Sequence, residues 1–261
     1  MRYFSYFIIL YFLPVVYLQA SYTGSPADPS FLQGGFTSQY LFHISSGYIN
    51  DTVWDKKIRP KTLPDSTALK TPQEFKIESQ WGAIILTLLK RLSVYTYLGV
   101  SKEKMDWENK PNYYGDENLK TKSHFSFSLG TKVILLRFGS LQIGVNAQYF
   151  SIPSVETIEK RIRDLYIPFP LSDQYLELKE WQAAVSAVKI LGPFSVYGGL
   201  KWMQSKLKVS ATGEPTLRFI NQKNLGLFTG LTINITRALY GTIEGRFFDE
   251  YALSFATITA F

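Results

Sequence analysis

The sequence predicts an all-β protein, a transmembrane antiparallel β-barrel of about 10 to 12 strands. Three observations predict this fold: alternating apolar and polar residues, short connections that alternate with long ones, and high hydrophobicity without long apolar runs. Hydrophobic residues make up 46% and aromatic residues 16% of the chain, yet no segment beyond the N-terminus is apolar enough for a spanning helix. Apolar residues dispersed in this way favour lipid-facing strands.

The N-terminus has the layout of a secretory signal peptide. Arg2 precedes an apolar stretch over residues 7–17, and Ala20 offers a small residue at the cleavage point. A membrane anchor is the alternative, but the stretch is shorter than the roughly 20 residues that a spanning helix needs. The expected organisation is a signal peptide at 1–20, a periplasmic N-terminal segment at 21–37 and an outer-membrane barrel at 38–261.

Two neighbouring segments carry the clearest alternation. In residues 123–137, apolar side chains such as Phe125 fall on one face, and polar ones such as His124 fall on the other. Residues 141–153 repeat the pattern. A period of two predicts strands that separate two different environments. A water-soluble sandwich would show the same alternation, so a single strand does not distinguish the two folds.

The lengths of the connections distinguish them better. If the first strand starts in the periplasm, every long loop falls outside the cell and every tight turn inside, as in bacterial outer-membrane barrels. A sandwich has no reason to keep this order along the whole chain, so the barrel is favoured. The tight breaks are 90–92, 138–140, 191–193 and 236–238, and the long segments are about 51–73, 105–122, 154–175 and 210–218.

The chain ends on an amphipathic strand. Phe255 and the terminal Phe261 fall on the same face of this strand, in phase with an outward apolar surface. We therefore expect Phe261 to be the signal that barrel assembly machinery recognises. In the preceding strand, residues 239–247, Glu244 and Arg246 should face the lumen because charges on a lipid face are costly.

One long connection has a helical period. Within residues 154–166, apolar residues from Val155 to Leu165 recur about every three to four positions, with charged residues between them. This pattern predicts a short amphipathic helix packed over the barrel rim. The alternative is a loop that folds into the lumen as a constriction.

The sequence offers candidate pore-lining residues but no catalytic, metal or cofactor site. The two histidines, His43 and His124, form no catalytic or metal-ligating set, and there is no cysteine. The net charge of +7 is spread without a basic stripe, so nucleic acid is not expected as a partner. By strand phase, the side chains expected to line a weakly selective pore are Lys76, Glu78, His124, Lys132, Gln148, Glu180, Lys201, Glu244 and Arg246.

Several segments spread along the chain carry a colinear resemblance to one family. They are Gly24–Ser30, His43–Lys56, Gly144–Tyr149, Glu180–Ala183, Tyr197–Trp202 and Lys223–Phe261. In this order they resemble the chlamydial major outer membrane protein family, over most of the strands and little of the loops. The chain is shorter than a typical member, and it lacks the cysteines that cross-link that family into a rigid envelope.

The resemblance implies an outer-membrane porin, a passive diffusion channel for small hydrophilic solutes. The partners it implies are outer-membrane lipid, the barrel assembly machinery and further copies of the chain in a homotrimer. The alternative is a non-conducting structural or adhesive surface barrel of the cell envelope. This alternative stays open because a barrel of about 10 strands is little wider than the eight-stranded barrels that side chains fill.

Overall fold

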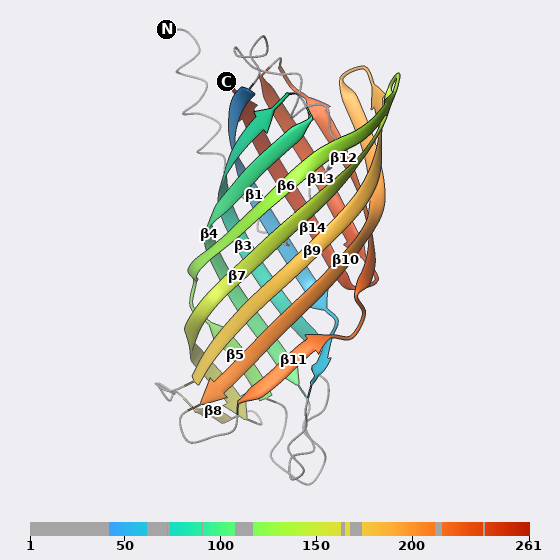
Figure 1. Ribbon diagram of the computed structural model, residues 1–261. Coiled ribbons are helices and arrows are strands. Elements are labelled where there is room, and N and C mark those ends of the chain that lie inside the picture. Colours follow the sequence, from blue (N-terminus) through green and yellow to red (C-terminus); the bar gives the residue numbers. More distant parts are fainter. Residues whose placement is uncertain are drawn as a thin grey trace, which may run out of the picture.

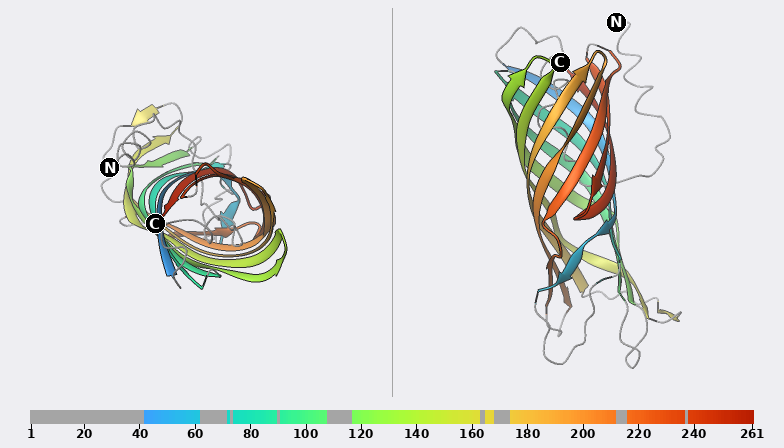
Figure 2. Two further views of the ribbon diagram at one scale, coloured as in Figure 1. Left: turned by 90° about the horizontal axis from the view of Figure 1, so that it is seen from above. Right: turned by 90° about the vertical axis from the view of Figure 1, so that its right-hand side faces the viewer.

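Ten long antiparallel strands close into a barrel in the computed structural model (Figures 1 and 2). The structure describes residues 42–61, 72, 74–89, 91–107, 117–162, 165–167, 174–211, 216–236 and 238–261, so the expected signal peptide and the segment 21–37 lie outside the described residues. The predicted fold class is confirmed. The barrel strands are β1 (Phe42–Lys56), β3 (Glu74–Leu88), β4 (Leu92–Trp107), β6 (His124–Phe138), β7 (Leu141–Ile162), β9 (Gln174–Leu191), β10 (Phe194–Ala211), β12 (Leu225–Asn234), β13 (Leu239–Phe247) and β14 (Glu250–Ala260).

The first and last strands close the barrel. β1 and β14 pair antiparallel along most of their lengths. The backbone N–H of Phe261 donates to the carbonyl oxygen of Ile44 at 2.9 Å, which extends this seam to the last residue of the sequence. The side chain of Phe261 is 41% exposed on the outer face, in the phase that the sequence predicted. Closure satisfies the backbone groups of both strands, as a lipid environment requires.

Tight turns gather at one end of the barrel, the upper end in Figure 1, where the C-terminus also lies. They join β3 to β4, β6 to β7, β9 to β10 and β12 to β13. Left-handed backbone at Leu89 (φ 52°), Gly139 (φ 57°) and Gly192 (φ 64°) reverses the chain in three of these turns. At the other end the β13–β14 connection is also short and contains Phe248 (φ 79°). The longer connections all leave from that end.

Four short strands extend the wall beyond the β13–β14 hairpin. After β1 the chain crosses this hairpin: the N–H of Lys57 donates to the carbonyl oxygen of Asp249, and its own carbonyl accepts from the N–H of Gln222. β5 pairs with β4 and β7, β8 pairs with β7, and β2 pairs with β11, which pairs with β10. The short strands are β2 (Ile58–Pro60), β5 (Glu117–Thr121), β8 (Leu165–Ile167) and β11 (Leu217–Asn221).

The amphipathic helix predicted within residues 154–166 is wrong. β7 continues as a strand to Ile162, and β5 pairs with residues 157–162. The segment is rich in β-branched residues, and β5 offers it a hydrogen-bonded partner, whereas a short surface helix would be marginal in water. In the described part of the chain, no helix is long and apolar enough to cross a membrane.

Candidate functional site

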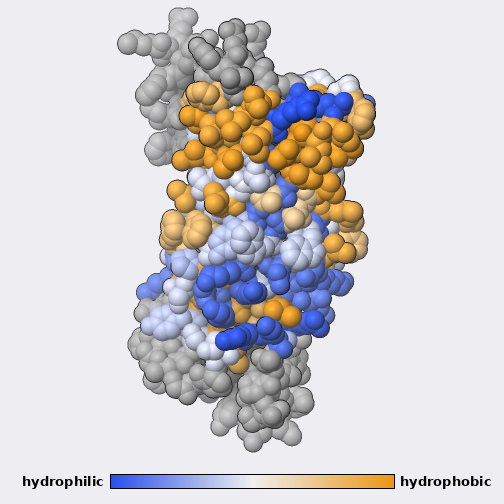
Figure 3. Space-filling view, in the orientation of Figure 1, coloured by the Kyte–Doolittle hydropathy of each residue, from blue (hydrophilic) through white to orange (hydrophobic). Residues whose placement is uncertain are grey.

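The outer face divides into an apolar half and a charged half. Next to the tight turns, the outward side chains are apolar, and several are more than half exposed, such as Leu129 (55%) and Leu200 (56%). Towards the other end the same strands carry outward charges, such as Lys102 on β4 and Lys206 on β10. Figure 3 shows this division, with hydrophobic residues in the upper half and hydrophilic residues below.

Aromatic side chains mark the boundary between the two halves. Phe127, Tyr149 and Trp181 form a row across β6, β7 and β9, with ring centroids 6.2 Å and 4.7 Å apart. Trp202 on β10 and Tyr251 on β14 are exposed at 42% and 48%. Aromatic residues gather where a membrane meets water. A closed ladder, an apolar belt and this aromatic boundary define the protein as an outer-membrane β-barrel, with its tight turns in the periplasm.

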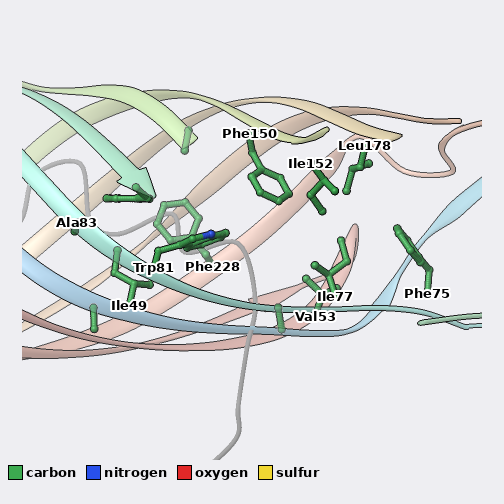
Figure 4. Close-up of a cluster of buried hydrophobic side chains, with 14 of the residues drawn as sticks. Ile49, Val53, Phe75, Ile77, Trp81, Ala83, Phe150, Ile152, Leu178 and Phe228 are labelled. Atoms are coloured by element: carbon green, nitrogen blue, oxygen red, sulfur yellow. The ribbon is translucent and has the colours of Figure 1, made fainter. Parts of the chain in front are cut away.

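Beyond the aromatic boundary the interior of the barrel contains a group of packed apolar side chains. Phe75 and Ile77 of β3 point inward from one wall, and Ile152 and Leu178 point inward from β7 and β9 on the other (Figure 4). Each of these side chains is at most 1% exposed. The extracellular part of the barrel thus has the arrangement of a water-soluble protein, with a hydrophobic core and a polar surface.

Lys76 and Glu78 face outward, not into the lumen as the strand phase predicted. They alternate with the buried Phe75 and Ile77, and the Nζ of Lys76 forms an ion pair with Glu74 at 2.9 Å on the surface. The prediction assumed that the outer face is apolar along the whole strand. That rule holds only where lipid surrounds the barrel, and this part of β3 lies beyond the aromatic boundary.

A buried group of charged residues crosses the lumen near the boundary. The Nζ of Lys56 on β1 lies 2.5 Å from Glu180 on β9 and 3.2 Å from Glu250 on β14. β1 and β9 lie on opposite sides of the barrel. We call this group the ion-pair cluster; it comprises Asp51, Lys56, Glu180, Lys201, Glu244, Arg246, Asp249 and Glu250, all at most 2% exposed.

Lys201 and Arg246 complete the cluster. The Nζ of Lys201 lies 2.5 Å from Glu250 and 3.0 Å from Asp249. The guanidinium of Arg246 contacts Glu250 at 2.7 Å, Glu244 at 3.3 Å and Asp51 at 3.4 Å. Glu250 therefore has all three cations of the cluster as partners, and these shared contacts tie β1, β10, β13 and β14 together inside the barrel.

Beside the cluster and on its periplasmic side, aromatic and polar side chains fill the interior. Trp81 of β3 packs edge-on against Phe150 of β7, with ring centroids 5.6 Å apart across the lumen. The hydroxyl of Tyr95 donates to Asn146 at 2.8 Å. The Nζ of Lys132 lies 5.1 Å from the centre of the Tyr95 ring, close enough for a cation–π contact.

Six of the residues predicted to line a pore do face the interior. Glu180, Lys201, Glu244 and Arg246 belong to the ion-pair cluster. Lys132 and Gln148 lie on the periplasmic side of the cluster, both 4% exposed. Their place inside the barrel is a finding, whereas their role in conduction stays a prediction.

The predicted His124 also faces inward, at the extracellular start of β6. Its Nε2 lies 3.3 Å from Glu103, which in turn accepts a hydrogen bond from Thr121 at 2.8 Å. His43 lies at the periplasmic start of β1, so the two histidines stand at opposite ends of the barrel. Among the described residues, no group of histidine and carboxylate side chains could hold a metal ion.

Sequence reasoning missed half of the ion-pair cluster: Asp51, Lys56, Asp249 and Glu250. For Lys56 the reason is a bulge in β1, where the pairing with β14 shifts between Val53 and Asp55. One extra residue reverses the facing of every position that follows it. Regular alternation would have placed Lys56 outward with Trp54. Asp51 and Glu250 do follow the alternation of their strands, so the strand phase could have predicted that both face the lumen.

Comparisons with known proteins give similarity of fold. The outer membrane protease OmpT from Escherichia coli is 15% identical over 84% of this chain and 93% of its own, with a TM-score of 0.37. An outer membrane channel from Pseudomonas putida F1 is 9% identical over 88% of this chain and 98% of its own, with a TM-score of 0.45. The attachment protein Ail of Yersinia pestis is 10% identical over 84% and 94%, with a TM-score of 0.29.

No family model matches the chain, and no curated protein matches it. Membership of the chlamydial major outer membrane protein family therefore stays a prediction from the sequence. The same holds for the barrel assembly machinery and a homotrimer as partners.

Proposed function

We propose that the protein is a non-conducting surface barrel of the outer membrane, with a structural or adhesive role. The observation that carries this proposal is the contact of Lys56 with Glu180, which joins opposite walls of the barrel at 2.5 Å with both side chains at most 2% exposed. Groups that line a water-filled passage stay accessible to water. The complete burial of this pair supports a lumen that is closed at the level of the aromatic boundary.

Two further groups of packed side chains support a closed lumen. Phe75, Ile77 and their neighbours form an apolar core towards the extracellular end, and the contact of Trp81 with Phe150 lies level with the ion-pair cluster, because Phe150 is the pairing partner of Glu180. A hydrophobic constriction blocks ions by excluding water. The wall that continues beyond the lipid would then serve as a rigid support for the extracellular connections, which suits a surface protein.

A second candidate is the porin that the sequence suggested, a passive diffusion channel for small hydrophilic solutes. It is favoured by the polar character of the interior at membrane level, where Lys132, Asn146, Gln148 and Gln182 all point inward. Polar lumen groups are typical of conducting barrels. In this case the ion-pair cluster would have to separate before solutes pass.

Planar bilayer recordings separate the two candidates. We expect the refolded wild-type protein to insert and to give no stepwise conductance, because side chains pack the interior from the aromatic boundary to the extracellular end of the barrel. A large porin with an aqueous channel, inserted under the same conditions, is the positive control. Insertion of the protein itself is checked by the electrophoretic shift between boiled and unboiled samples and by protection from added protease in liposomes.

Reproducible conductance steps from the inserted wild-type protein would overturn the closed barrel and establish the porin. In that case the variant Lys56→Gln, which removes the charge that joins β1 to Glu180 and Glu250, should lengthen the open time of the steps. Lys102→Gln, on the outer face of β4, is the matched control and should leave them unchanged.

A further inference from the structure

A groove of about 520 Å³ runs over the outer face of the apolar belt, across β6, β7, β9, β10 and β12. Small side chains such as Ala147 and Ala183 lie beside larger ones such as Leu200, Trp202 and Leu225. Ala183 is the direct pairing partner of Trp202, so a methyl group stands next to an indole ring and leaves a hollow beside it. The outward lining is apolar, as an acyl chain requires.

Beyond the aromatic boundary, the same wall carries a basic surface. We define it as the exposed, outward cations Arg59, Lys179, Lys206, Lys208 and Arg218 on β2, β9, β10 and β11. The pairing register places Lys179 next to Lys206 and Lys208 next to Arg218. The cations are thus neighbours across adjacent strands, where like charges destabilise the fold unless an anion lies between them.

One carboxylate lies within the basic surface. Glu177 forms ion pairs with Lys179 and with Lys208, the latter at 2.8 Å, and these hydrogen bonds lower its pKa. It lies beyond the aromatic boundary, outside the lipid, and stays ionised. Five cations against one carboxylate leave a net charge of +4 on this surface. Within the described part of the chain, Arg59, Lys206 and Arg218 form no ion pair.

The groove and the basic surface lie one above the other. Lys179 and Ala183 are four positions apart in β9, and Trp202 and Lys206 are four positions apart in β10, a rise of about 13 Å along each strand. The flexible stems of the lysines let their ammonium groups reach down towards the membrane interface. The level between them, at Trp181, is where lipid headgroups lie.

We propose that this wall binds an anionic, phosphate-bearing lipid of the outer leaflet. An acyl chain of the lipid lies in the groove, and its phosphate groups lie against Lys206, Lys208 and Arg218. Clusters of exposed cations at a membrane interface recognise anionic headgroups in this way. Binding is independent of whether the lumen conducts, because none of these side chains faces the interior.

A second copy of the chain fits this wall less well. It would have to bring a net negative surface against the basic surface, whereas the outer wall of β3 and β4 carries mixed charge from Glu74 to Asp106. The phosphates of a lipid supply the missing negative charge, and its flexible acyl chain follows the shape of the groove. Charge complementarity therefore selects the lipid.

The test compares a phosphorylated lipid A with the same lipid after phosphatase treatment, each titrated onto the detergent-solubilised barrel and counted by native mass spectrometry. The wild-type protein should bind the phosphorylated form at least about tenfold more tightly. The triple variant Lys206→Gln, Lys208→Gln and Arg218→Gln should lose this preference. Lys102→Gln with Lys104→Gln, on the opposite wall at a similar height, is the matched control and should keep it.

The groove is tested by Ala183→Phe, which fills the hollow with a ring. It should weaken binding of both lipid forms and leave the preference for phosphate unchanged. The proposal is overturned if wild type binds both forms equally, if the triple variant and its control lose the preference alike, or if inorganic phosphate alone displaces the lipid. It is also overturned if Ala183→Phe abolishes an oligomer of the chain and leaves lipid binding intact.

Discussion

At the residue scale, Arg246 is the most informative side chain of the interior. It is fully buried and contacts the carboxylates of Asp51, Glu244 and Glu250. It also donates to the hydroxyl of Ser254, which in turn donates to Asp51. The ion-pair cluster contains five carboxylates and three cations. Loss of any one cation leaves buried negative charge without compensation, which costs far more than loss of a surface ion pair.

Replacing this side chain tests the cluster. We expect Arg246→Met to lower the free energy of unfolding by about 3–5 kcal/mol, because three carboxylates lose their shared partner in a buried site. Lys102→Met removes an exposed cation from the outer face of β4 and should change the free energy of unfolding by no more than about 0.5 kcal/mol. Urea unfolding in lipid vesicles, followed by tryptophan fluorescence, measures both. Equal losses in the two variants would show that the cluster is not stabilising.

The sequence predicted single residues well where the local environment was uniform. Gln148 and Glu244 face inward as expected, since their strands alternate regularly between lipid and lumen. Lys56 was missed because its facing depends on the bulge at Val53, which leaves no signature in the residue types nearby. The contact of Lys56 with Glu180 depends on two segments far apart in the chain, and no local pattern encodes it.

At the scale of the strands, large aromatic side chains lie over glycines of the neighbouring strand. Tyr95 is paired with Gly130, and Tyr197 is paired with Gly230. A Cβ atom at either glycine would lie 2.3 Å from the tyrosine ring. The tyrosine ring thus occupies the space that a side chain at the glycine position would take, and it packs over the glycine backbone inside the lumen.

We expect Gly130→Ala to destabilise the barrel by about 1–3 kcal/mol, because the methyl group forces the Tyr95 ring out of its position. Gly82→Ala is the matched control on β3, where the nearest atom to the added Cβ is a carbonyl oxygen at 3.8 Å. The free energy of unfolding of Gly82→Ala should be within about 0.5 kcal/mol of the wild-type value. Thermal unfolding, read from the electrophoretic shift of unboiled samples, gives both values. A neutral Gly130→Ala would mean that the ring is free to move.

Strand patterns predicted the membrane-embedded elements better than the extracellular ones. The alternation in β6, β7, β13 and β14 gave the correct facing because each of these strands has lipid on one side. In β3 the same rule failed at Lys76 and Glu78, which lie in water. The helical period within residues 154–166 failed because pairing with β5 outweighed it. Only the three-dimensional arrangement provides that partner.

At the scale of the whole molecule, the outer face of the barrel combines two opposite arrangements along one axis. The outer face is apolar next to the tight turns and polar beyond the aromatic boundary (Figure 3), whereas the interior changes from mixed aromatic and polar side chains to a core with more aliphatic ones. The change along the outer face fixes how deep the barrel sits, because moving it along its axis would expose the belt to water or bury lysines in lipid. The position in the membrane is thus set by the side chains of the outer face.

This position is testable with an arginine placed at two depths. Leu129→Arg, in the middle of the apolar belt on β6, should cost about 2–4 kcal/mol of folding free energy in lipid. Gln204→Arg, beyond the boundary on β10, should cost no more than about 1 kcal/mol. Chemical denaturation in vesicles measures the difference. Similar costs at both sites would mean that the belt has been assigned to the wrong part of the wall.

The seam between β1 and β14 has a consequence for biogenesis. Phe261 follows the last strand of the barrel, yet its backbone N–H donates to the carbonyl oxygen of Ile44, near the start of the first strand. Asp51 likewise accepts a hydrogen bond from Ser254, 203 positions along the chain. Until the final segment arrives, the sheet keeps two unpaired edges, and so many distant contacts make folding slow. A chain cut short by even one strand would have no native partner for its first, so the barrel can close only once the last strand is in place.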